Sequence, residues 1–229
     1  SASVIVLHGL GDTAAGWVDA VSGMWAGALP YARFVLPTAP TMPITVNMGM
    51  RMPGWYDIES LEADRTKQAC KGLEESRAFV ASLIQDEMKR GIPLHRIALV
   101  GFSQGGALAL TTGLDEPSLR GEKEESDGTS ALGRGLGAVA VLSGYNPKPD
   151  LIRHTEVLHK TTPVGFFHGD ADEVVVPAWG KDAYDFVTAA REGIEGASPV
   201  SRKTYAGLGH GATMEEINDV ATFLQSSIP

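Results

Sequence analysis

Runs of apolar residues alternate along the chain with stretches in which apolar residues recur every three or four positions. The runs predict β-strands at residues 3–8, 34–37, 97–100, 136–142, 164–167 and 201–205. The spaced stretches predict helices at residues 17–29, 64–89, 104–114, 177–191 and 214–227. Apolar strands separated by helices are typical of a parallel sheet that is covered on both faces. We therefore expect an α/β fold with a mostly parallel, doubly wound sheet.

Two segments depart from this alternation. Residues 37–60 are rich in Pro and Met and have no clean period, which indicates a long irregular loop. Residues 115–135 are acidic, contain Gly and Ser, and indicate a solvated insertion. Since no repeat or linker interrupts the chain, we expect a single domain over residues 1–229. The first strand starts almost at Ser1, and the chain lacks an initiating Met, so we also expect further sequence ahead of it.

Charge and cysteine content narrow the function classes. The chain has 19 Lys and Arg against 28 Asp and Glu, a net charge of -9, and no basic cluster. This balance argues against a nucleic-acid partner and against electrostatic docking on anionic lipid. No apolar run approaches the ~20 residues of a spanning helix, so we expect no stable membrane insertion. A lone cysteine, Cys70, fits a reducing compartment, and we expect a cytoplasmic protein. The sequence sets no oligomeric state.

Gly101, Ser103 and Gly105 form a G-x-S-x-G pattern between a predicted strand and a predicted helix. A nucleophile elbow needs this context, because the sharp turn leaves no room for side chains at the two glycines and lifts the serine above the sheet. The alternative is a glycine-rich turn with an incidental serine. The context favours Ser103 as a nucleophile.

A serine nucleophile needs a histidine base, and the chain has six histidines. His210 follows the last predicted strand and is flanked by glycines, which matches the chain order Ser, Asp, His of hydrolases with such an elbow. The alternative for any loop histidine is a solvated surface residue. We predict His210 as the base.

The orienting acid should follow the strand before last, where Asp170 and Asp172 both lie. Asp172 directly precedes an apolar turn that can bury it, and a triad carboxylate must be held firmly. Asp170 sits beside Gly169, where an aspartate usually braces a turn. We predict Asp172 as the acid, with Asp170 as the alternative.

Residues 9–14 allow two interpretations. They match G-x-G-x-x-A, the dinucleotide fingerprint, which makes a Rossmann-type oxidoreductase the runner-up. That fold also wants an acid at the end of the second strand, and residues 36–40 contain none. The other interpretation is an oxyanion hole formed by the backbone N–H groups of Leu10 and Gln104. We expect the second, with no cofactor; the histidine spacing and the lone cysteine also predict no metal site.

The sequence resembles the acyl-protein thioesterase/carboxylesterase (lysophospholipase-like) family, including plant members. Five motifs in order carry this resemblance, at residues 8–13, 47–58, 101–107, 168–172 and 209–210. It implies an α/β-hydrolase fold without a helical cap, with Ser103, Asp172 and His210 as the triad. It also implies hydrolysis of S-acyl thioesters on lipidated proteins, of lysophospholipids or of small carboxylic esters. Some plant members are described as short-acyl deacetylases, which is the alternative activity within the family.

Acyl-chain contacts are predicted around the methionine-rich loop. Thioether side chains mould easily around an alkyl chain, and in the family this region resembles an acyl-binding lid. Candidate acyl-binding residues are Met48, Met50, Met52, Trp55 and Tyr145. Two alternatives stand: the methionines fill the core beneath the loop, or the loop or Tyr145 plugs the channel and leaves a short-acyl enzyme.

We therefore expect a serine hydrolase that acts on an acylated protein or a small acyl ester or thioester, in depalmitoylation or lipid metabolism. The non-enzyme alternative is a receptor or binding module that keeps the hydrolase fold without turnover.

Overall fold

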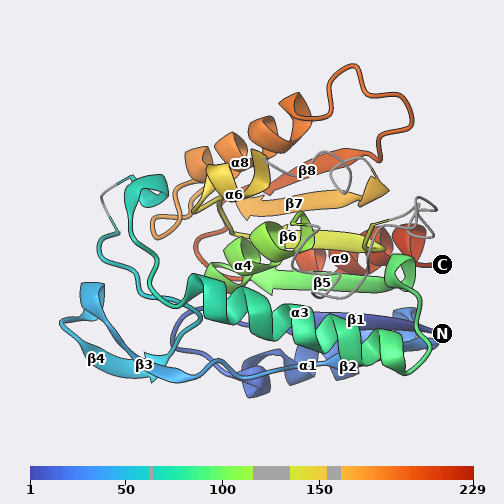
Figure 1. The fold of residues 1–229 in the computed structure, drawn as a ribbon, viewed down its shortest axis with the longest axis horizontal. Coiled ribbons are helices and arrows are strands. Elements are labelled where there is room, and N and C mark those ends of the chain that lie inside the picture. The colour runs from blue at the N-terminus through green and yellow to red at the C-terminus, as the bar shows by residue number, and fades with distance from the viewer. Residues whose placement is uncertain (62–63, 116–134, 154–160) are drawn as a thin grey trace, which may run out of the picture.

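The structure, a computed structural model, describes residues 1–61, 64–115, 135–153 and 161–229. A six-stranded sheet runs through it in the order β2-β1-β5-β6-β7-β8, and all neighbouring strands are parallel (Figure 1). Its strands are β1 (Ala2–Leu7), β2 (Ala32–Val35), β5 (Ile97–Phe102), β6 (Ala138–Leu142), β7 (Val164–Gly169) and β8 (Val200–Tyr205). All six predicted strands are confirmed, with ends shifted by up to two residues.

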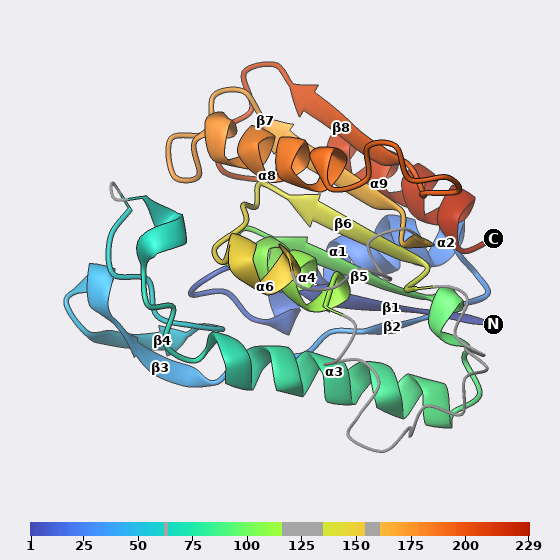
Figure 2. The same ribbon diagram turned by 45° about the horizontal axis from the view of Figure 1, so that its top comes forward.

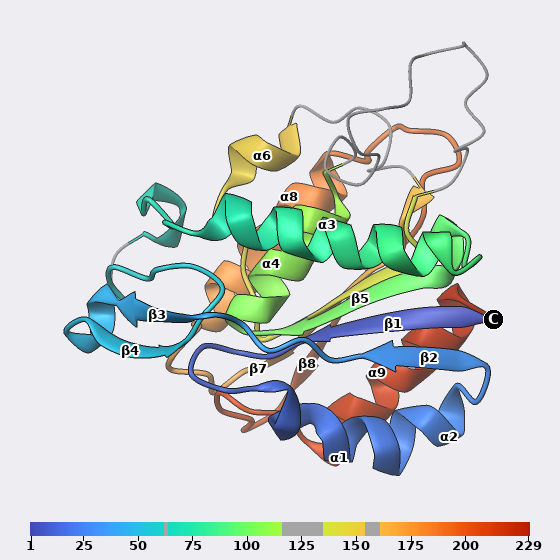
Figure 3. The same ribbon diagram turned by 60° about the horizontal axis from the view of Figure 1, so that its bottom comes forward.

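Helices cover both faces of the sheet (Figure 3). One face carries α3 (Leu73–Lys89), α4 (Gln104–Gly113), α6 (Pro149–Arg153) and α8 (Pro177–Ala189). The other carries α1 (Val18–Ala20), α2 (Ala26–Ala28) and α9 (Met214–Ser227). Single 3-10 turns lie at Ala14–Trp17, Thr45–Asn47, Arg65–Lys67 and Leu94–Arg96, and a wider π turn at Val21–Trp25 joins α1 to α2. The doubly wound α/β architecture is therefore confirmed.

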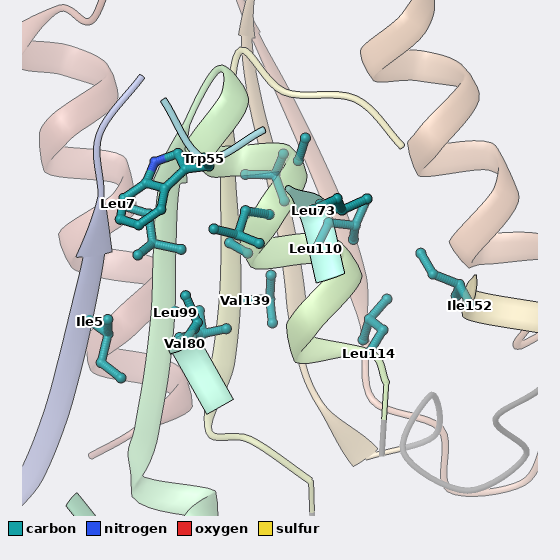
Figure 4. Close-up of a cluster of buried hydrophobic side chains, with 14 of the residues drawn as sticks. Ile5, Leu7, Trp55, Leu73, Val80, Leu99, Leu110, Leu114, Val139 and Ile152 are labelled. Atoms are coloured by element: carbon teal, nitrogen blue, oxygen red, sulfur yellow. The ribbon is translucent and has the colours of Figure 1, made fainter. Parts of the chain in front are cut away.

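The central strands are buried on both faces, which explains why their sequences are apolar throughout. On β5, Leu99 packs into the cluster beneath α3 and α4, whereas Ala98 and Val100 pack into the cluster beneath α9. Figure 4 shows the first cluster, in which Leu99 and Val139 of the sheet lie close to Val80 and Leu110 of the helices. Strand β8 lies at one edge of the sheet, and its residues are largely exposed apart from Tyr205.

The order of the strands marks the place of the functional site. From β1 the chain turns outward to β2, whereas β5, β6, β7 and β8 follow one another in the opposite direction. Ligands bind in such open sheets beyond the carboxyl ends of the strands, where the direction of winding changes. The carboxyl ends of β1 and β5 meet at this point, at the end of the molecule opposite both termini (Figures 1 and 2).

A small antiparallel hairpin lies at the same end and was not predicted. It pairs β3 (Thr41–Ile44) with β4 (Met50–Pro53), and Met48 and Gly49 complete its turn with positive φ angles of 56° and 76°. Pro43 and Pro53 obscure the strand pattern, because proline is unusual in strands except at edges. The segment predicted as an irregular loop is thus partly ordered by backbone pairing.

The predicted helix at residues 64–89 is wrong at its start, because α3 begins only at Leu73. Asp64 caps a single 3-10 turn at Arg65–Lys67, and Cys70 and Gly72 then adopt positive φ angles of 53° and 93°. Two left-handed residues break a right-handed helix. Cys70 therefore lies in a buried turn before α3, and not within the helix.

The acidic insertion predicted at residues 115–135 falls outside the described residues except at its two ends. Among the helices that are described, none combines the length and apolar character needed to cross a bilayer.

Candidate active site

Ser103 stands in a strained turn between β5 and α4. Its φ and ψ are 54° and -118°, outside the regions that residues other than glycine normally adopt. A Cβ on Gly101 would overlap the backbone of Gly105, and a Cβ on Gly105 would overlap the carbonyls of Leu7 and His8. Both glycines of the motif are therefore required by the close approach of strand, turn and helix, as expected of a nucleophile elbow.

Three strand ends bring a serine, a histidine and an aspartate into one hydrogen-bonded row. Ser103 Oγ follows β5 and lies 2.9 Å from Nε2 of His210, which follows β8. Nδ1 of His210 lies 2.7 Å from Oδ2 of Asp172, which follows β7. The arrangement has the geometry in which a histidine can take a proton from the serine while a carboxylate orients the ring.

The Asp172 carboxylate is buried, and both of its oxygens accept hydrogen bonds. Its Oδ1 accepts hydrogen bonds of 2.9 Å from the N–H groups of both Val174 and Val175. Burial by itself raises the pKa of the carboxyl, but hydrogen bonds from His168, His210 and the Val175 N–H outweigh it. The net effect holds the pKa of Asp172 well below its usual range, so the group is ionised at neutral pH.

Asp170 has the bracing position that was expected of it. Its Oδ1 accepts a 2.7 Å hydrogen bond from the N–H of Gly207, and its own N–H donates to the carbonyl of Tyr205. Gly207 has a φ of 70°, and the loop that it opens carries His210. Asp170 therefore ties the end of β7 to this loop, and in the described part of the chain none of its hydrogen bonds reaches the imidazole ring of His210.

Two of the other described histidines, His8 and His95, take no part in this row. His8 is buried; its Nε2 accepts from the N–H of Ala39, so its Nδ1 carries the proton and donates to the carbonyl of Gly9. Burial lowers the pKa of His8, which keeps the ring neutral. His95 lies in the 3-10 turn before β5, at the far end of the sheet. His154 and His159 fall outside the described residues.

The two residues predicted to supply oxyanion donors, Leu10 and Gln104, lie beside the nucleophile. Gln104 is the first residue of α4, so its N–H is one of the free donors of a helix N-terminus. A Cβ on Gly9 would lie 3.5 Å from the Cβ of Ser103, which puts the backbone that leads to Leu10 beside the nucleophile. The Gln104 side chain also fixes the neighbouring loop, because it accepts from the Trp55 N–H and donates to the Tyr56 carbonyl.

A cleft of about 220 Å³ opens in front of Ser103 and His210. Its walls are largely apolar and come from the loop after β1, the segment after β3 and the loop after β7. The lining residues are Gly9, Leu10, Asp12, Val46, Asn47, Ile58, Leu61, Arg65, Phe102, Ser103, Val174, Val175 and His210. Leu61 and Val174 are partly exposed at 41% and 39%. The cleft can therefore hold an acyl group beside the serine.

None of the five predicted acyl-binding residues is among those that line this cleft. Met48 and Met50 lie at the tip of the hairpin and are 95% and 61% exposed, so they do not fill the core. Met52 is half-buried, and Trp55 and Tyr145 are buried. The lining residues Val46, Ile58 and Leu61 belong to the same part of the chain, but no periodicity in the sequence distinguishes them from their neighbours.

Arg65 lines both the cleft and a second cavity of about 350 Å³. Its guanidinium lies 4.9 Å from the ring centre of Tyr145 and 4.8 Å from that of Trp179, and it donates to the carbonyl of Val174. Tyr145 and Trp179 line the second cavity and not the cleft. No pattern in the sequence singles out Arg65, since its neighbours in space lie about 80 and 114 positions away along the chain.

In the described part of the chain, no group of three or more His, Cys, Asp or Glu side chains is arranged to hold a metal ion.

Comparison with known proteins gives one consistent result. A sequence model of the phospholipase/carboxylesterase family matches residues 1–228. Acyl-protein thioesterase 1 of Gibberella zeae is 39% identical over 235 residues, and the match covers all of this chain and 92% of that protein. Acyl-protein thioesterase 1 of Neurospora crassa is also 39% identical, with 100% of this chain and 88% of that protein covered. Both of these relatives come from fungi and not from plants.

Among solved structures, the Arabidopsis thaliana protein SOBER1 superposes with a TM-score of 0.82 at 26% identity, covering 100% of this chain and 99% of that one. Acyl-protein thioesterase 2 of Zea mays gives a TM-score of 0.77 at 27% identity, covering 100% of this chain and 94% of that one. The sequence resemblance and the fold therefore lead to the same group of proteins.

Proposed function

Because this chain belongs to the phospholipase/carboxylesterase family and is a hydrolase of carboxylic esters and thioesters, we propose that Ser103, His210 and Asp172 are its catalytic triad. The observation that carries the proposal is a pair of consecutive hydrogen-bond contacts. Ser103 Oγ lies 2.9 Å from His210 Nε2, and His210 Nδ1 lies 2.7 Å from Asp172 Oδ2. The nucleotide-binding interpretation of residues 9–14 is set aside, since it belongs to a different class of enzyme.

In the first half-reaction His210 acts as the base. Asp172 is ionised and accepts the Nδ1–H of His210, so Nε2 is free to take the proton of the Ser103 hydroxyl. Ser103 Oγ then attacks the acyl carbonyl carbon and forms a tetrahedral intermediate. When this intermediate collapses, His210 gives its proton to the leaving thiol or alcohol, and an acyl-serine remains.

The negative charge of the intermediate needs donors that are already in place. We expect the N–H groups of Leu10 and Gln104 to be these donors, and the N-terminus of α4 adds a favourable dipole. Losing one such donor typically costs ~10²–10³ in kcat.

In the second half-reaction a water molecule takes the place of the leaving group. His210 removes a proton from the water, hydroxide attacks the acyl-serine, and the proton returns to Ser103 as the carboxylic acid departs. These steps use only residues of the chain and require no cofactor.

For the substrate we propose a thioester-linked acyl group on a protein, with small acyl esters as surrogates. The names of the relatives, acyl-protein thioesterases, support this choice. Met48, Met50, Met52, Trp55 and Tyr145 stay a prediction as acyl-binding residues, and the apolar walls of the cleft support acyl binding independently of them. The cytoplasm stays the predicted location of this reaction.

The second candidate is a short-acyl esterase or deacetylase, and one observation favours it. The cleft holds only about 220 Å³ and the buried Arg65 forms part of its wall, so a long acyl chain would have to extend beyond the cleft. Each CH₂ that is buried contributes about 0.8 kcal/mol, or roughly a fourfold gain in kcat/KM, so the two candidates predict opposite trends with chain length.

The test is a panel of acyl thioesters and esters, measured for the wild-type protein and for Ser103→Ala. We expect turnover that depends on Ser103, with the variant reduced by ~10⁴-fold or more. A Ser103→Ala protein that keeps more than a few per cent of the activity would overturn the triad. The trend of kcat/KM with chain length separates the acyl-protein candidate, which favours long chains, from the short-acyl one.

A further inference from the structure

A second histidine contacts the carboxylate of the proposed triad. His168 lies near the end of β7 and is buried, with an exposed fraction of 3%. Its Nε2 lies 3.2 Å from Oδ2 of Asp172, the same oxygen that His210 Nδ1 approaches at 2.7 Å. We infer that His168 is a positioning residue that fixes the Asp172 carboxylate in the orientation His210 requires, an inference that rests on the triad proposed above.

The surroundings of His168 determine which of its ring nitrogens carries a proton. Its Nε2 lies 2.8 Å from the carbonyl oxygen of Val175 as well as 3.2 Å from the Asp172 carboxylate. A carbonyl and an ionised carboxylate only accept hydrogen bonds, so Nε2 must carry a proton and donate toward both oxygens. The ring is therefore a fixed donor, and a neutral tautomer with the proton on Nε2 satisfies both contacts.

This donor completes the coordination of a buried anion. Oδ1 of Asp172 accepts from the N–H groups of Val174 and Val175, and Oδ2 accepts from His210 and His168. Four donors match the four lone-pair positions of a carboxylate, so the group has no freedom to rotate without losing a bond. Apart from the opposing effect of burial, the bond from His168 stands first among the influences that hold the pKa of Asp172 below its usual range.

A glycine on the opposite helix makes the place for this ring. Gly180 lies in the first half of α8, where glycine costs about 0.5–1 kcal/mol relative to alanine. A Cβ at this position would overlap Nδ1 of His168. The packing of α8 against His168 therefore accounts for Gly180, and the ring is held from the side that faces away from Asp172.

His168 is not among the residues that line the cleft, so it acts through Asp172 and not on the substrate. Loss of its donor lets the carboxylate turn and weakens the bond to His210 during proton transfer. We expect kcat to fall by about 10- to 100-fold, within the range that mutation of an outer hydrogen-bond partner produces at other sites. KM should stay within about twofold, because binding of the acyl group does not involve this contact.

The test compares three variants with the wild-type protein. His168→Phe keeps a ring of similar size but removes the donor, whereas His168→Gln retains an N–H₂ group near the position of Nε2. Gly180→Ala displaces the ring and leaves its chemistry intact. The readouts are kcat, KM, thermal stability and the far-downfield proton NMR signal of the His210 Nδ1–H.

We expect His168→Phe to lower kcat and to weaken or shift the His210 signal. His168→Gln should recover at least half of the lost kcat on a logarithmic scale. Gly180→Ala should lower kcat and leave KM unchanged. The inference is overturned if His168→Phe keeps kcat within twofold of wild type, if Gln and Phe lose equally, or if the NMR signal does not move. If His168→Phe fails to fold, the other two variants decide. The inference is then overturned if Gly180→Ala loses no kcat, or if Gly180→Ala and His168→Gln lose kcat equally. Failure of the triad itself is recognised separately, by activity that survives Ser103→Ala.

Discussion

The proposed catalytic triad and the β3–β4 hairpin near it are stabilised by different kinds of contact. Ser103, Asp172 and His210 follow three neighbouring or nearby strands of a buried sheet, and backbone contacts fix each of their turns. The β3–β4 hairpin has only two strands, and the side chains of Met48 and Met50 at its tip point into solvent. A two-stranded hairpin is marginally stable alone, so its position depends on contacts at its base, such as the bond from Trp55 N–H to Gln104.

The difference in how these two regions are held indicates which residues govern the reaction and which govern substrate selectivity. The turn that carries the proposed nucleophile is rigidly fixed, since no side chain fits at Gly101 or Gly105 without moving the main chain. The cleft beside Ser103 is lined by single apolar residues such as Val46, Leu61 and Val174, of which Leu61 and Val174 are partly exposed. We therefore expect changes at the catalytic row to be large and changes near the hairpin to be modest and dependent on the substrate.

The largest expected effect separates the two aspartates after β7. Asp172→Asn should reduce kcat by ~10⁴-fold, because an amide favours the wrong tautomer of His210. Asp170→Asn should cost less than about tenfold, since its oxygen can still accept from Gly207 N–H. Steady-state kinetics of both variants decide the question, and the reverse ranking would move the acid to Asp170.

The next effect concerns folding. Gly105→Ala puts a Cβ into the carbonyls of Leu7 and His8, and we expect a loss of about 3–5 kcal/mol in the free energy of unfolding or failure to fold. Gly27→Ala in α2 is the matched control, because a Cβ there meets nothing and alanine favours a helix. Urea unfolding of the two proteins provides the comparison. Equal stabilities would show that the elbow tolerates side chains.

A pH effect of similar or smaller size should come from Glu216 in α9. Burial raises the pKa of this carboxyl to about 7 from 4.5; the Thr213 N–H lowers it in part, and Asp219 and Asp172 raise it further. The folded state then binds a proton more tightly than the unfolded chain does. The stabilisation of the folded state by protonated Glu216 is complete below pH 4.5 and is lost as the pH rises through about 7. The free energy of unfolding changes by roughly 3 kcal/mol over this range.

Glu216→Gln should remove this dependence and leave a flatter curve of unfolding free energy between pH 4.5 and pH 7. Urea unfolding at half-unit pH steps measures it. Curves of the same slope for both proteins would contradict the raised pKa.

The smallest expected effect is at the hairpin tip. Met48→Ala combined with Met50→Ala should lower kcat/KM for octanoyl or longer esters by about 3- to 10-fold, because apolar area that can cover the chain is lost. Acetyl esters should change by less than twofold. Val18→Ala, a partly exposed apolar residue of α1 on the other face of the sheet, serves as control. Equal losses for short and long chains, or none, would rule out an acyl-binding role for these methionines.

Features that depend on burial or on close backbone contact could be predicted from the sequence. The strands were predictable because burial on both faces makes them apolar, as at Val139 and Ala140. The pattern around Ser103 was recognisable because steric contact demands glycine at two fixed positions. Chain order then selected His210, and the adjacent apolar turn favoured Asp172 over Asp170; the contacts of both residues agree with that prediction in geometry.

What could not be predicted depends on long-range packing. Arg65 meets Tyr145 and Trp179 only after the chain has folded, and His168 meets Gly180 across the gap between a strand and a helix. The start of α3 was misplaced because Cys70 adopts a left-handed conformation that its side chain does not favour. The hairpin was missed because prolines interrupt its alternation and its apolar tip faces solvent.

The most direct test of the central claim is covalent labelling of the protein with a fluorophosphonate, followed by peptide mass spectrometry. Such a reagent reports an activated serine, because phosphonylation requires the hydroxyl to lose its proton to a neighbouring base. We predict one phosphonyl group per chain, on Ser103, and labelling that is abolished in Ser103→Ala and strongly slowed in His210→Ala and Asp172→Asn. Labelling of a different residue, or unlabelled Ser103 in a protein that still turns over acyl esters, would contradict the account.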